Sequence, residues 1–163
     1  MKAESKIRIR AVDPSDREWV RQFTAAHWGS DMMITRGTVL YISEQQGFLA
    51  ETGGEVAGFV SYRIEGAECE ITSLDSLREG MGIGTRLIER VAEAARSAGC
   101  TRLFLITTND NLHALRFYQR RGFRLVALYP GAVNESRKLK PEIPLIGNDG
   151  IPLRDEIELE LDL

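Results

Sequence analysis

Cysteine is scarce in this sequence. Its 163 residues contain two cysteines, Cys69 and Cys100, which lie far apart along the chain. Neither stands at metal-ligand spacing from His27 or His113, so the patterns of a zinc site and of a disulfide framework are both missing. We therefore expect no metal and no disulfide.

Long apolar runs are missing as well. No segment approaches the roughly 18 consecutive apolar residues that a membrane span needs. The N-terminal segment MKAESKIRIR has no apolar core of signal-peptide length. We expect a cytoplasmic protein with no membrane partner.

The sequence has no excess of positive charge. Its 21 basic and 24 acidic residues give a formal net charge of −3, which predicts no general attraction to nucleic acid or to anionic membranes. A phosphate-bearing ligand would need a local binding site. The hydrophobic share of 43% is ordinary for a globular protein, and the length fits one domain over residues 1–163.

The first part of the chain predicts a strand and then a helix. Residues 7–12 alternate apolar and basic side chains, and Asp13-Pro14-Ser15 can start a helix over residues 15–28. Residues 29–37 have weak periodicity, which leaves a short helix and a mobile loop as alternatives. Three strands separated by glycine turns follow, and they predict an antiparallel meander over residues 48–51, 55–64 and 68–74.

The second part mixes helices and strands. Its last strand alternates Ile157, Leu159 and Leu161 with three glutamates, which predicts one face in water. The order of elements indicates an α+β domain with a mixed, largely antiparallel sheet flanked by helices. After the glycine cluster we expect a helix over residues 83–98, ended by Gly99, and then a strand over 102–107 that is covered on both faces. A second helix follows, capped by Asp110 or Asn111 and ended by Gly122. The remaining predicted elements are a strand over 123–129, helical turns within 134–140 and a long loop over 141–152.

A glycine cluster, Gly80, Gly82 and Gly84, stands between a strand and an amphipathic helix. The N–H groups and the positive dipole end of a helix N-terminus favour an anion, and glycine lets phosphate oxygens approach the backbone. The alternative interpretation is a flexible turn. A dinucleotide-binding fold would place such glycines after the first strand, and a P-loop would end in Gly-Lys-Ser/Thr; this chain does neither.

Two segments together resemble the GNAT acetyltransferase family. EGMGIGTRLIE over residues 79–89 is similar to the family's Q/R-x-x-G-x-G/A cofactor loop. NLHALRFYQRRGF over residues 111–123 is similar to its N-x-x-A-x-x-F-Y-x-x-x-G-F segment. The order of elements agrees over about residues 7–130, and the resemblance implies the GNAT acyl-CoA N-acyltransferase fold.

The resemblance implies that acetyl-CoA is the cosubstrate and that a primary amine attacks its thioester directly. The residues that it places on the cofactor are Gly80, Gly82, Gly84 and Thr85 at the pyrophosphate, Leu74 and Ser76 beside the pantetheine arm, and Asn111 near the next helix. Asn111 can equally be a helix cap.

Two residues are candidates for the chemistry. Tyr118 matches the family tyrosine that points to the thioester sulfur, where a phenol can protonate the departing thiolate; its alternative role is in the core. Glu70 matches a glutamate that acts in some members as a base through water, and its alternative is an exposed surface position. Asp75 is a weaker candidate for the base.

Glu79 departs from the family pattern, which has Gln or Arg there. A carboxylate near a pyrophosphate costs affinity unless it points into water. Arg78 or Arg86 can supply the missing cation.

The acceptor is expected to be a small-molecule or peptide amine, held by residues 28–37 and 129–152. His27, Trp28, Asp31 and Arg36 are candidates for its pocket, whereas Arg137, Lys138 and Lys140 read as a solvated face. A non-catalytic acyl-CoA-binding or sensory domain is the alternative function. An open sheet also leaves an edge strand through which a homodimer can form.

Overall fold

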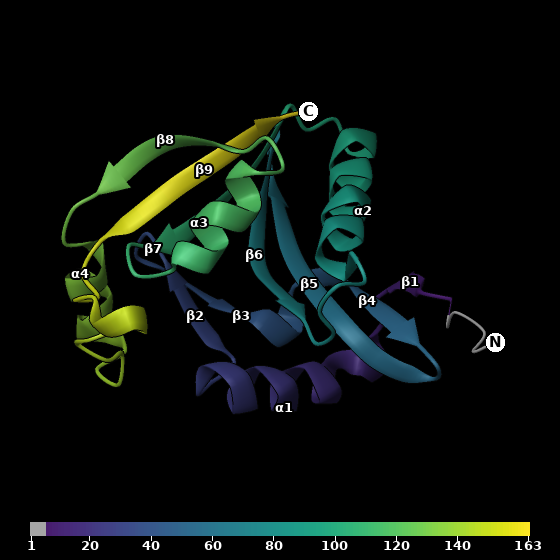
Figure 1. Cartoon of the computed structure of the whole chain (residues 1–163), viewed down its shortest axis with the longest axis horizontal. Helices are drawn as coiled ribbons and strands as arrows, with labels where there is room; N and C mark the ends of the chain where they lie inside the picture. Colours follow the sequence, from purple (N-terminus) through teal and green to yellow (C-terminus); the bar gives the residue numbers. More distant parts are fainter. Residues whose placement is uncertain (1–5) are drawn as a thin grey trace. The chain divides into compact units, whose positions relative to one another are not determined.

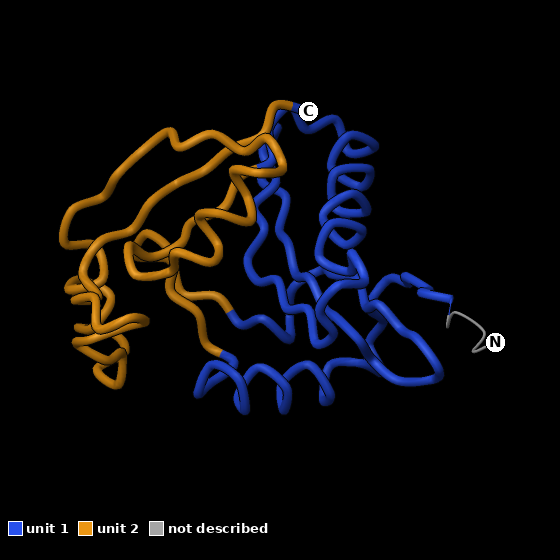
Figure 2. Tube along the Cα trace, viewed as in Figure 1, with its two compact units in different colours: residues 1–31, 41–103, 163 blue, residues 32–40, 104–162 orange. Residues whose placement is uncertain are grey.

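The computed structural model describes residues 6–163. Residues 1–5, the start of the expected single domain, lie outside the described residues. The chain divides into two compact units, shown in blue and orange in Figure 2. Unit 1 contains residues 1–31, 41–103 and 163, and unit 2 contains residues 32–40 and 104–162.

Unit 1 begins with the predicted strand and helix (Figure 1). They are β1 (Arg8–Ala11) and α1 (Arg17–Trp28), joined by the 3₁₀ turn η1 (Pro14–Asp16). Asp13 and Asp16 form a capping box at the start of η1, as the sequence predicts for Asp13.

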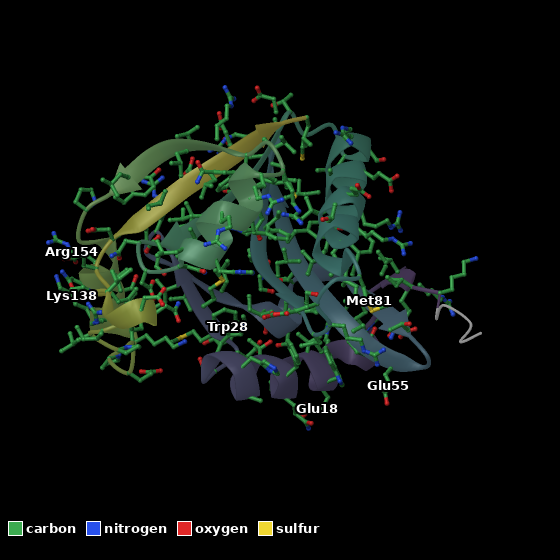
Figure 3. The ribbon with its side chains drawn as sticks, in the orientation of Figure 1. Glu18, Trp28, Glu55, Met81, Lys138 and Arg154 are labelled. Atoms are coloured by element: carbon green, nitrogen blue, oxygen red, sulfur yellow. The ribbon has the colours of Figure 1, made fainter. Side chains whose placement is uncertain are left out.

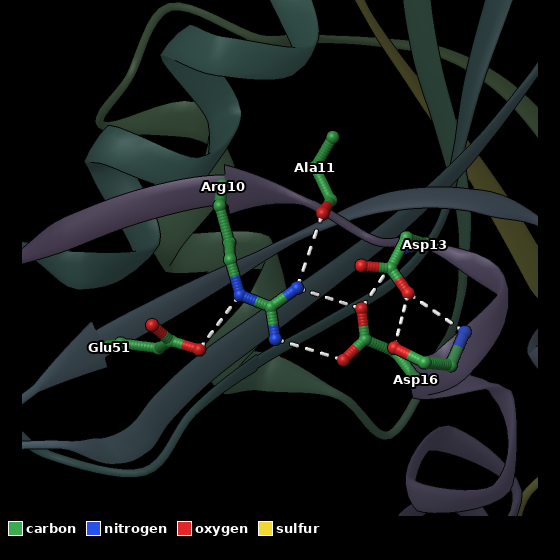
Figure 4. Close-up of polar contacts among 6 residues, drawn as sticks. Arg10, Ala11, Asp13, Asp16 and Glu51 are labelled. Carbon is green, nitrogen blue, oxygen red and sulfur yellow. Dashed lines mark hydrogen bonds and ion pairs between the residues drawn. The ribbon is translucent and has the colours of Figure 1, made fainter.

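Arg10 connects three segments of unit 1 (Figure 4). From β1, its guanidinium donates to Asp16 at 2.8 and 2.9 Å and to Glu51 at 2.8 Å. The hydrogen bond from Arg10 is the main cause that lowers the pKa of Asp16. These contacts fix the start of α1 against the first strand.

The predicted meander is confirmed. After the turn η2 (Ile42–Glu44), the strands β4 (Gln46–Thr52), β5 (Glu55–Glu65) and β6 (Glu68–Ser76) pair antiparallel, and β1 adds to β4. Within unit 1 the strand order is therefore β1-β4-β5-β6.

A β-bulge interrupts β6. Ser61 pairs with Ser73 while Tyr62 pairs with Ile71, so Thr72 has no partner of its own on β5. The hydroxyl of Ser61 bonds those of Thr72 at 2.7 Å and Ser73 at 2.5 Å. Side chains alternate between the two faces along a regular strand. The extra residue therefore puts Leu74 and Ser76 on the face opposite to the one that unbroken alternation from Glu68 would give them.

The two helices of unit 1 cover opposite faces of β5. A Cβ on Gly58 would lie 2.6 Å from Ile83 of α2 (Ile83–Ser97), so only glycine lets this helix approach so closely. The next residue, Phe59, points to the other face, where its ring packs edge-on against Trp19 and Phe23 of α1. This packing sets the position of the α2 N-terminus.

Unit 2 contains the remaining helices and strands. Within it, β9 lies between β7 and β8, and β8 pairs with β9 antiparallel. Its main elements are β7 (Arg102–Thr108, which begins in unit 1), α3 (Leu112–Gln119), β8 (Arg124–Tyr129), α4 (Ala132–Leu139), η3 (Asn148–Gly150) and β9 (Glu156–Asp162).

The expected helix or loop over residues 29–37 is wrong. This segment contributes β2 (Met32–Thr35), which forms a two-stranded sheet with β3 (Thr38–Tyr41). Arg36 and Gly37 make the turn between them with positive φ angles of 46° and 78°. The apolar run MMIT lacks the alternation that identifies a half-exposed strand, so the pattern was not visible.

Two predictions about exposure are wrong. Glu156 and Glu158 of β9 are only 4% and 8% exposed. The backbone N–H of Arg36 donates to Glu156 and the hydroxyl of Tyr129 donates to Glu158, so both carboxylates are bonded within the protein. On β7 buried residues alternate with half-buried ones, so one of its faces is less covered than expected.

The long loop after α4 is held by side chains. Arg137 donates to the carbonyls of Ile143 at 3.2 Å, Pro144 at 2.6 Å and Leu153 at 2.5 Å, so it is not part of a solvated face as expected. Lys138 does extend into water beside it (Figure 3).

The residues just after β7 fasten the other end of this loop. Asn109 accepts from the N–H groups of Arg154 and Asp155, and Asp110 accepts from Asn148 N–H at 2.9 Å. A Cβ on Gly147 would lie 2.1 Å from the Asp110 carboxylate, so the loop can approach only because residue 147 is glycine.

Among the described residues, no helix has the length and apolar character needed to span a membrane.

Candidate functional site

The glycine loop of unit 1 leads directly into α2. Gly80 and Gly82 have φ angles of 75° and 69°, a left-handed conformation that only glycine adopts without strain. A Cβ on either residue would meet nothing within 4 Å, so conformation and not space requires glycine here. Gly84, in contrast, is buried in the first turn of the helix.

The N-terminus of α2 is suited to an anion. Its N-cap residue is Gly82, which has no side chain to bond the N–H groups of the first turn. The first turn contains no acidic residue, and Thr85 is half-buried within it. Figure 3 labels Met81 on the exposed loop just before this turn. The helix dipole adds a partial positive charge at the same place.

Leu74 and Ser76 lie at the end of β6, beyond the bulge. They pair with Val60 and Gly58 on the β5 side. The hydroxyl of Ser76 donates to the carbonyl of Arg78 at 3.1 Å and so shapes the tight connection to the glycine loop.

Glu79 is exposed at the start of the loop. Of the two arginines that could compensate its charge, Arg78 forms an ion pair of 2.8 Å with Glu55, and Arg86 is exposed on the first turn of α2. Whether Glu79 faces a bound phosphate stays a prediction.

Glu70 is buried near the start of β6, with 3% exposure. Its carboxylate accepts from Arg63 Nε of the neighbouring strand at 3.0 Å. The structure therefore does not place Glu70 at an exposed surface position, and the ion pair gives it a structural role in the sheet. Its role as a base stays a prediction.

Asp75 lies next to the last residue of β6, close to the glycine loop, and is half-buried. Burial raises the pKa of its carboxyl, an effect opposed by a hydrogen bond from Trp28 and by the charge of His27. Trp28 Nε1 donates to the carboxylate at 3.5 Å from the last turn of α1, where its side chain is labelled in Figure 3. His27 is fixed there by stacking on Phe23.

The remaining acceptor candidate of unit 1 has a structural role. Asp31 accepts from the backbone N–H of Ser43 at 2.8 Å and from its hydroxyl at 2.5 Å. It thereby holds the turn η2.

Asn111 is the N-cap of α3 in unit 2. Its side-chain oxygen accepts from Ala114 N–H at 3.1 Å, which confirms the predicted helix cap. The cap uses the amide oxygen, so the amide nitrogen can still donate to a ligand. Contact with the cofactor stays a prediction.

Tyr118 is buried, with 6% exposure, on the same helix. Its ring packs edge-on against Phe117 and Phe123, at centroid distances of 5.1 and 5.2 Å. The aromatic contacts fix the direction of the phenol, whether its role is in the core or in catalysis.

Unit 2 also contains a cavity of about 130 Å³ with mostly apolar walls. Glu156 is in the wall, and its carboxylate accepts from the backbone N–H of Arg36 at 3.4 Å. The Arg36 guanidinium lies 3.8 Å from the ring centroid of Tyr129, whose hydroxyl donates to Glu158 at 2.9 Å. No local sequence pattern predicts this cluster, because Arg36 and the glutamates are far apart in the chain.

Comparison with known proteins identifies the family. A family model described as "Acetyltransferase (GNAT) family" matches residues 15–123. The chain is 46% identical to the uncharacterized protein YdhI of Bacillus subtilis (strain 168) over 142 residues, which cover 86% of this chain and 89% of that protein.

Two solved structures show the fold. An IAA acetyltransferase from Bacillus cereus has a TM-score of 0.75 at 23% identity, over 97% of this chain and 100% of that one. A Bacillus subtilis acetyltransferase in complex with CoA has a TM-score of 0.69 at 22% identity, over 97% and 99%. The resemblance and the α+β fold expected from the sequence are confirmed. The chain belongs to the GNAT family of acetyltransferases.

Proposed function

We propose that this chain, acting as a single catalytic domain, transfers an acetyl group from acetyl-CoA to a primary amine while both substrates are bound together. The observation that carries the proposal is the arrangement in unit 1, where a glycine-flanked helix N-terminus follows a strand that carries the half-buried carboxylate of Asp75. Membership of the GNAT family supports it.

The residues present fit the cofactor. The first-turn N–H groups of α2 and the hydroxyl of Thr85 would hold the pyrophosphate, and Gly80 and Gly82 would let the loop backbone turn toward it. Leu74 and Ser76 would pair their backbone with the pantetheine arm, as an added strand does. Asn111 would donate from its amide nitrogen. Bound acetyl-CoA supplies a thioester that an amine can attack.

An amine can attack only after it has lost its proton, so a base is required. We propose Asp75, because its half-buried carboxylate lies next to the last residue of β6, close to the glycine loop, and burial raises its pKa. Glu70 is the competing candidate, and its ion pair with Arg63 opposes that role because the guanidinium stabilises the charged carboxylate.

Tyr118 would act on the leaving group, the thiolate of CoA. Its phenol and a thiol have neighbouring pKa values in water, so the hydroxyl can donate a proton to a departing thiolate. The packing against Phe117 and Phe123 holds the phenol in one direction, which a positioned acid needs.

The test is release of the CoA thiol from acetyl-CoA across a panel of primary amines. The wild-type chain is expected to release thiol only when an amine is present. Tyr118→Phe is expected to lower kcat by about 10²-fold while the Kd for acetyl-CoA, measured by calorimetry, stays the same. Binding of acetyl-CoA without thiol release on any amine would instead assign a non-catalytic acyl-CoA-binding domain.

A further inference from the structure

The strand β8 lies at the outside of unit 2, beside β9 (Figure 1). Among residues 6–163 it pairs with β9 and with no other strand, so one row of its backbone N–H and C=O groups has no strand opposite it. A row of this kind can pair with a strand of another chain. Proteins commonly protect such an edge with charged side chains, with proline or with a very short strand.

The outer strand of unit 1 has this protection, whereas β8 has little of it. β1 is four residues long and contains Arg8 and Arg10. β8 is six residues long and has one charged residue, Arg124, at its first position. Three apolar side chains of β8 are exposed: Leu125 (53%), Val126 (42%) and Leu128 (60%).

A bulge in β8 turns the two exposed leucines to the same face. Leu125 pairs with Leu159 of β9, and Leu128 pairs with the neighbouring Ile157. Val126 has no partner of its own on β9. Residues that are opposite each other in a pair of strands share a face of the sheet. Leu159 is fully buried on that face while the leucines of β8 are more than half exposed, so the cover of this apolar face ends at β9.

The two ends of β8 carry polar groups on the other face. Arg124 pairs with Glu160 and donates to its carboxylate at 3.3 Å. The hydroxyl of Tyr129 donates at 2.9 Å to Glu158, which lies on the same face as Glu160 because the two are separated by one residue of β9. The strand thus has leucines on one face and an arginine and a tyrosine at its two ends on the other.

This arrangement is complementary to itself. Two identical strands that pair antiparallel are related by a twofold axis. An axis through the middle of β8 places Leu125 of one copy opposite Leu128 of the other, and does so twice. The same register places each Arg124 opposite the neutral ring of Tyr129, so no like charges meet. One register therefore satisfies both faces of the strand.

We propose that β8 is an interface between two copies of this chain, joined antiparallel with Leu125 of each copy opposite Leu128 of the other. Hydrogen bonds between the two β8 strands continue the sheet across the twofold axis. The four leucines cover one another on the face where the cover of a single copy ends. A second copy has the matching pattern of side chains by necessity, whereas a different protein would need to have it independently.

Sedimentation velocity over a dilution series tests this interface. The wild-type chain is expected to have twice the mass of one chain, and to dissociate on dilution. Leu125→Lys and Leu128→Glu should each raise the dissociation constant at least about 100-fold, because each places a charge against a leucine at two equivalent positions. Both side chains are exposed in a single copy, so the variants should fold, and thermal unfolding checks that they do.

The double variant with Leu125→Lys and Leu128→Glu tests the register. It brings opposite charges together at both positions, and its dissociation constant should return to within about 10-fold of the wild-type value. Leu145→Lys is the matched control, because it changes an apolar side chain of unit 2 that is 73% exposed and lies outside β8. This control should leave the dissociation constant unchanged.

Three results would overturn the proposal. A wild-type chain that has the mass of one copy at every concentration would assign the edge of β8 to a partner of another kind. A dimer that persists in both single variants, or that Leu145→Lys disrupts equally, would place the interface elsewhere. A double variant that stays as dissociated as the single ones would contradict the register.

Discussion

The two units of the molecule are stabilised in different ways. Unit 1 relies on hairpin-paired strands and on helices packed on both faces of them, and its glycine loop follows from the local geometry of β6 and α2. Unit 2 depends on side-chain bonds to a long irregular loop, from Arg137, Asn109 and Asp110. We infer that the first arrangement suits a glycine loop whose backbone must keep one conformation, whereas the second supports a loop whose length and sequence can vary.

The substitution expected to have the largest effect is at the proposed base, Asp75, and it should change the rate of the chemical step without changing cofactor binding. Asp75→Asn should lower kcat by about 10²- to 10³-fold while acetyl-CoA binding stays unchanged. Glu70→Gln is the matched control and should mainly reduce stability, since it breaks a buried ion pair. The reverse ranking of kcat would assign the base to Glu70.

The same variant has a signature in pH dependence. Because burial raises the pKa of Asp75 in the folded state, its ionisation costs stability; this cost is absent below the unfolded pKa and grows as pH rises through the folded one. Asp75→Asn should therefore be at least as stable as wild type at neutral pH in thermal unfolding. The activity of the wild type should rise over the pH range in which Asp75 ionises, and a loss of stability in the variant would show that the carboxylate is structural.

Removing the main support of the long loop should affect unit 2 alone. Arg137→Ala is expected to raise the acceptor KM about 10-fold and to lower the free energy of unfolding by about 2 to 3 kcal/mol, because three carbonyls lose a charged donor. Lys138→Ala on the same helix removes only an exposed ion pair and should cost less than about 0.5 kcal/mol. A weakened affinity for acetyl-CoA in Arg137→Ala would break the division between the units.

A substitution in the glycine loop should weaken the binding of acetyl-CoA. Gly82→Ala forces a left-handed conformation at a cost of about 1 to 2 kcal/mol, and we expect a Kd for acetyl-CoA about fivefold weaker by calorimetry. Gly53→Ala imposes the same kind of strain in the β4–β5 turn, where φ is 59°, and serves as the control for stability. Equal Kd values for the two variants would separate the loop from cofactor binding.

The smallest effect concerns Glu79. Its replacement by glutamine removes a negative charge at the exposed start of the loop, and we expect acetyl-CoA binding to tighten about twofold. An unchanged Kd in calorimetry would show that the side chain faces away from the phosphates.

The contrast between the units also explains what the sequence could predict. The meander and α2 were predictable because alternation and helical spacing are local patterns. The bulge at Thr72 has no such pattern, although it decides how the strand end carrying Asp75 is directed. The burial of Glu156 depends on segments more than 100 positions away, such as the one containing Arg36. The alternating glutamates of β9 alone therefore predict a half-exposed strand.

The most direct test of the central claim, direct transfer from acetyl-CoA to an amine, is the intact mass of the protein after incubation with acetyl-CoA alone. Direct transfer predicts an unchanged mass, with thiol released only when an amine acceptor is added. A gain of one acetyl group with simultaneous thiol release, reversed when the amine is added, would reveal an acetylated enzyme and contradict it.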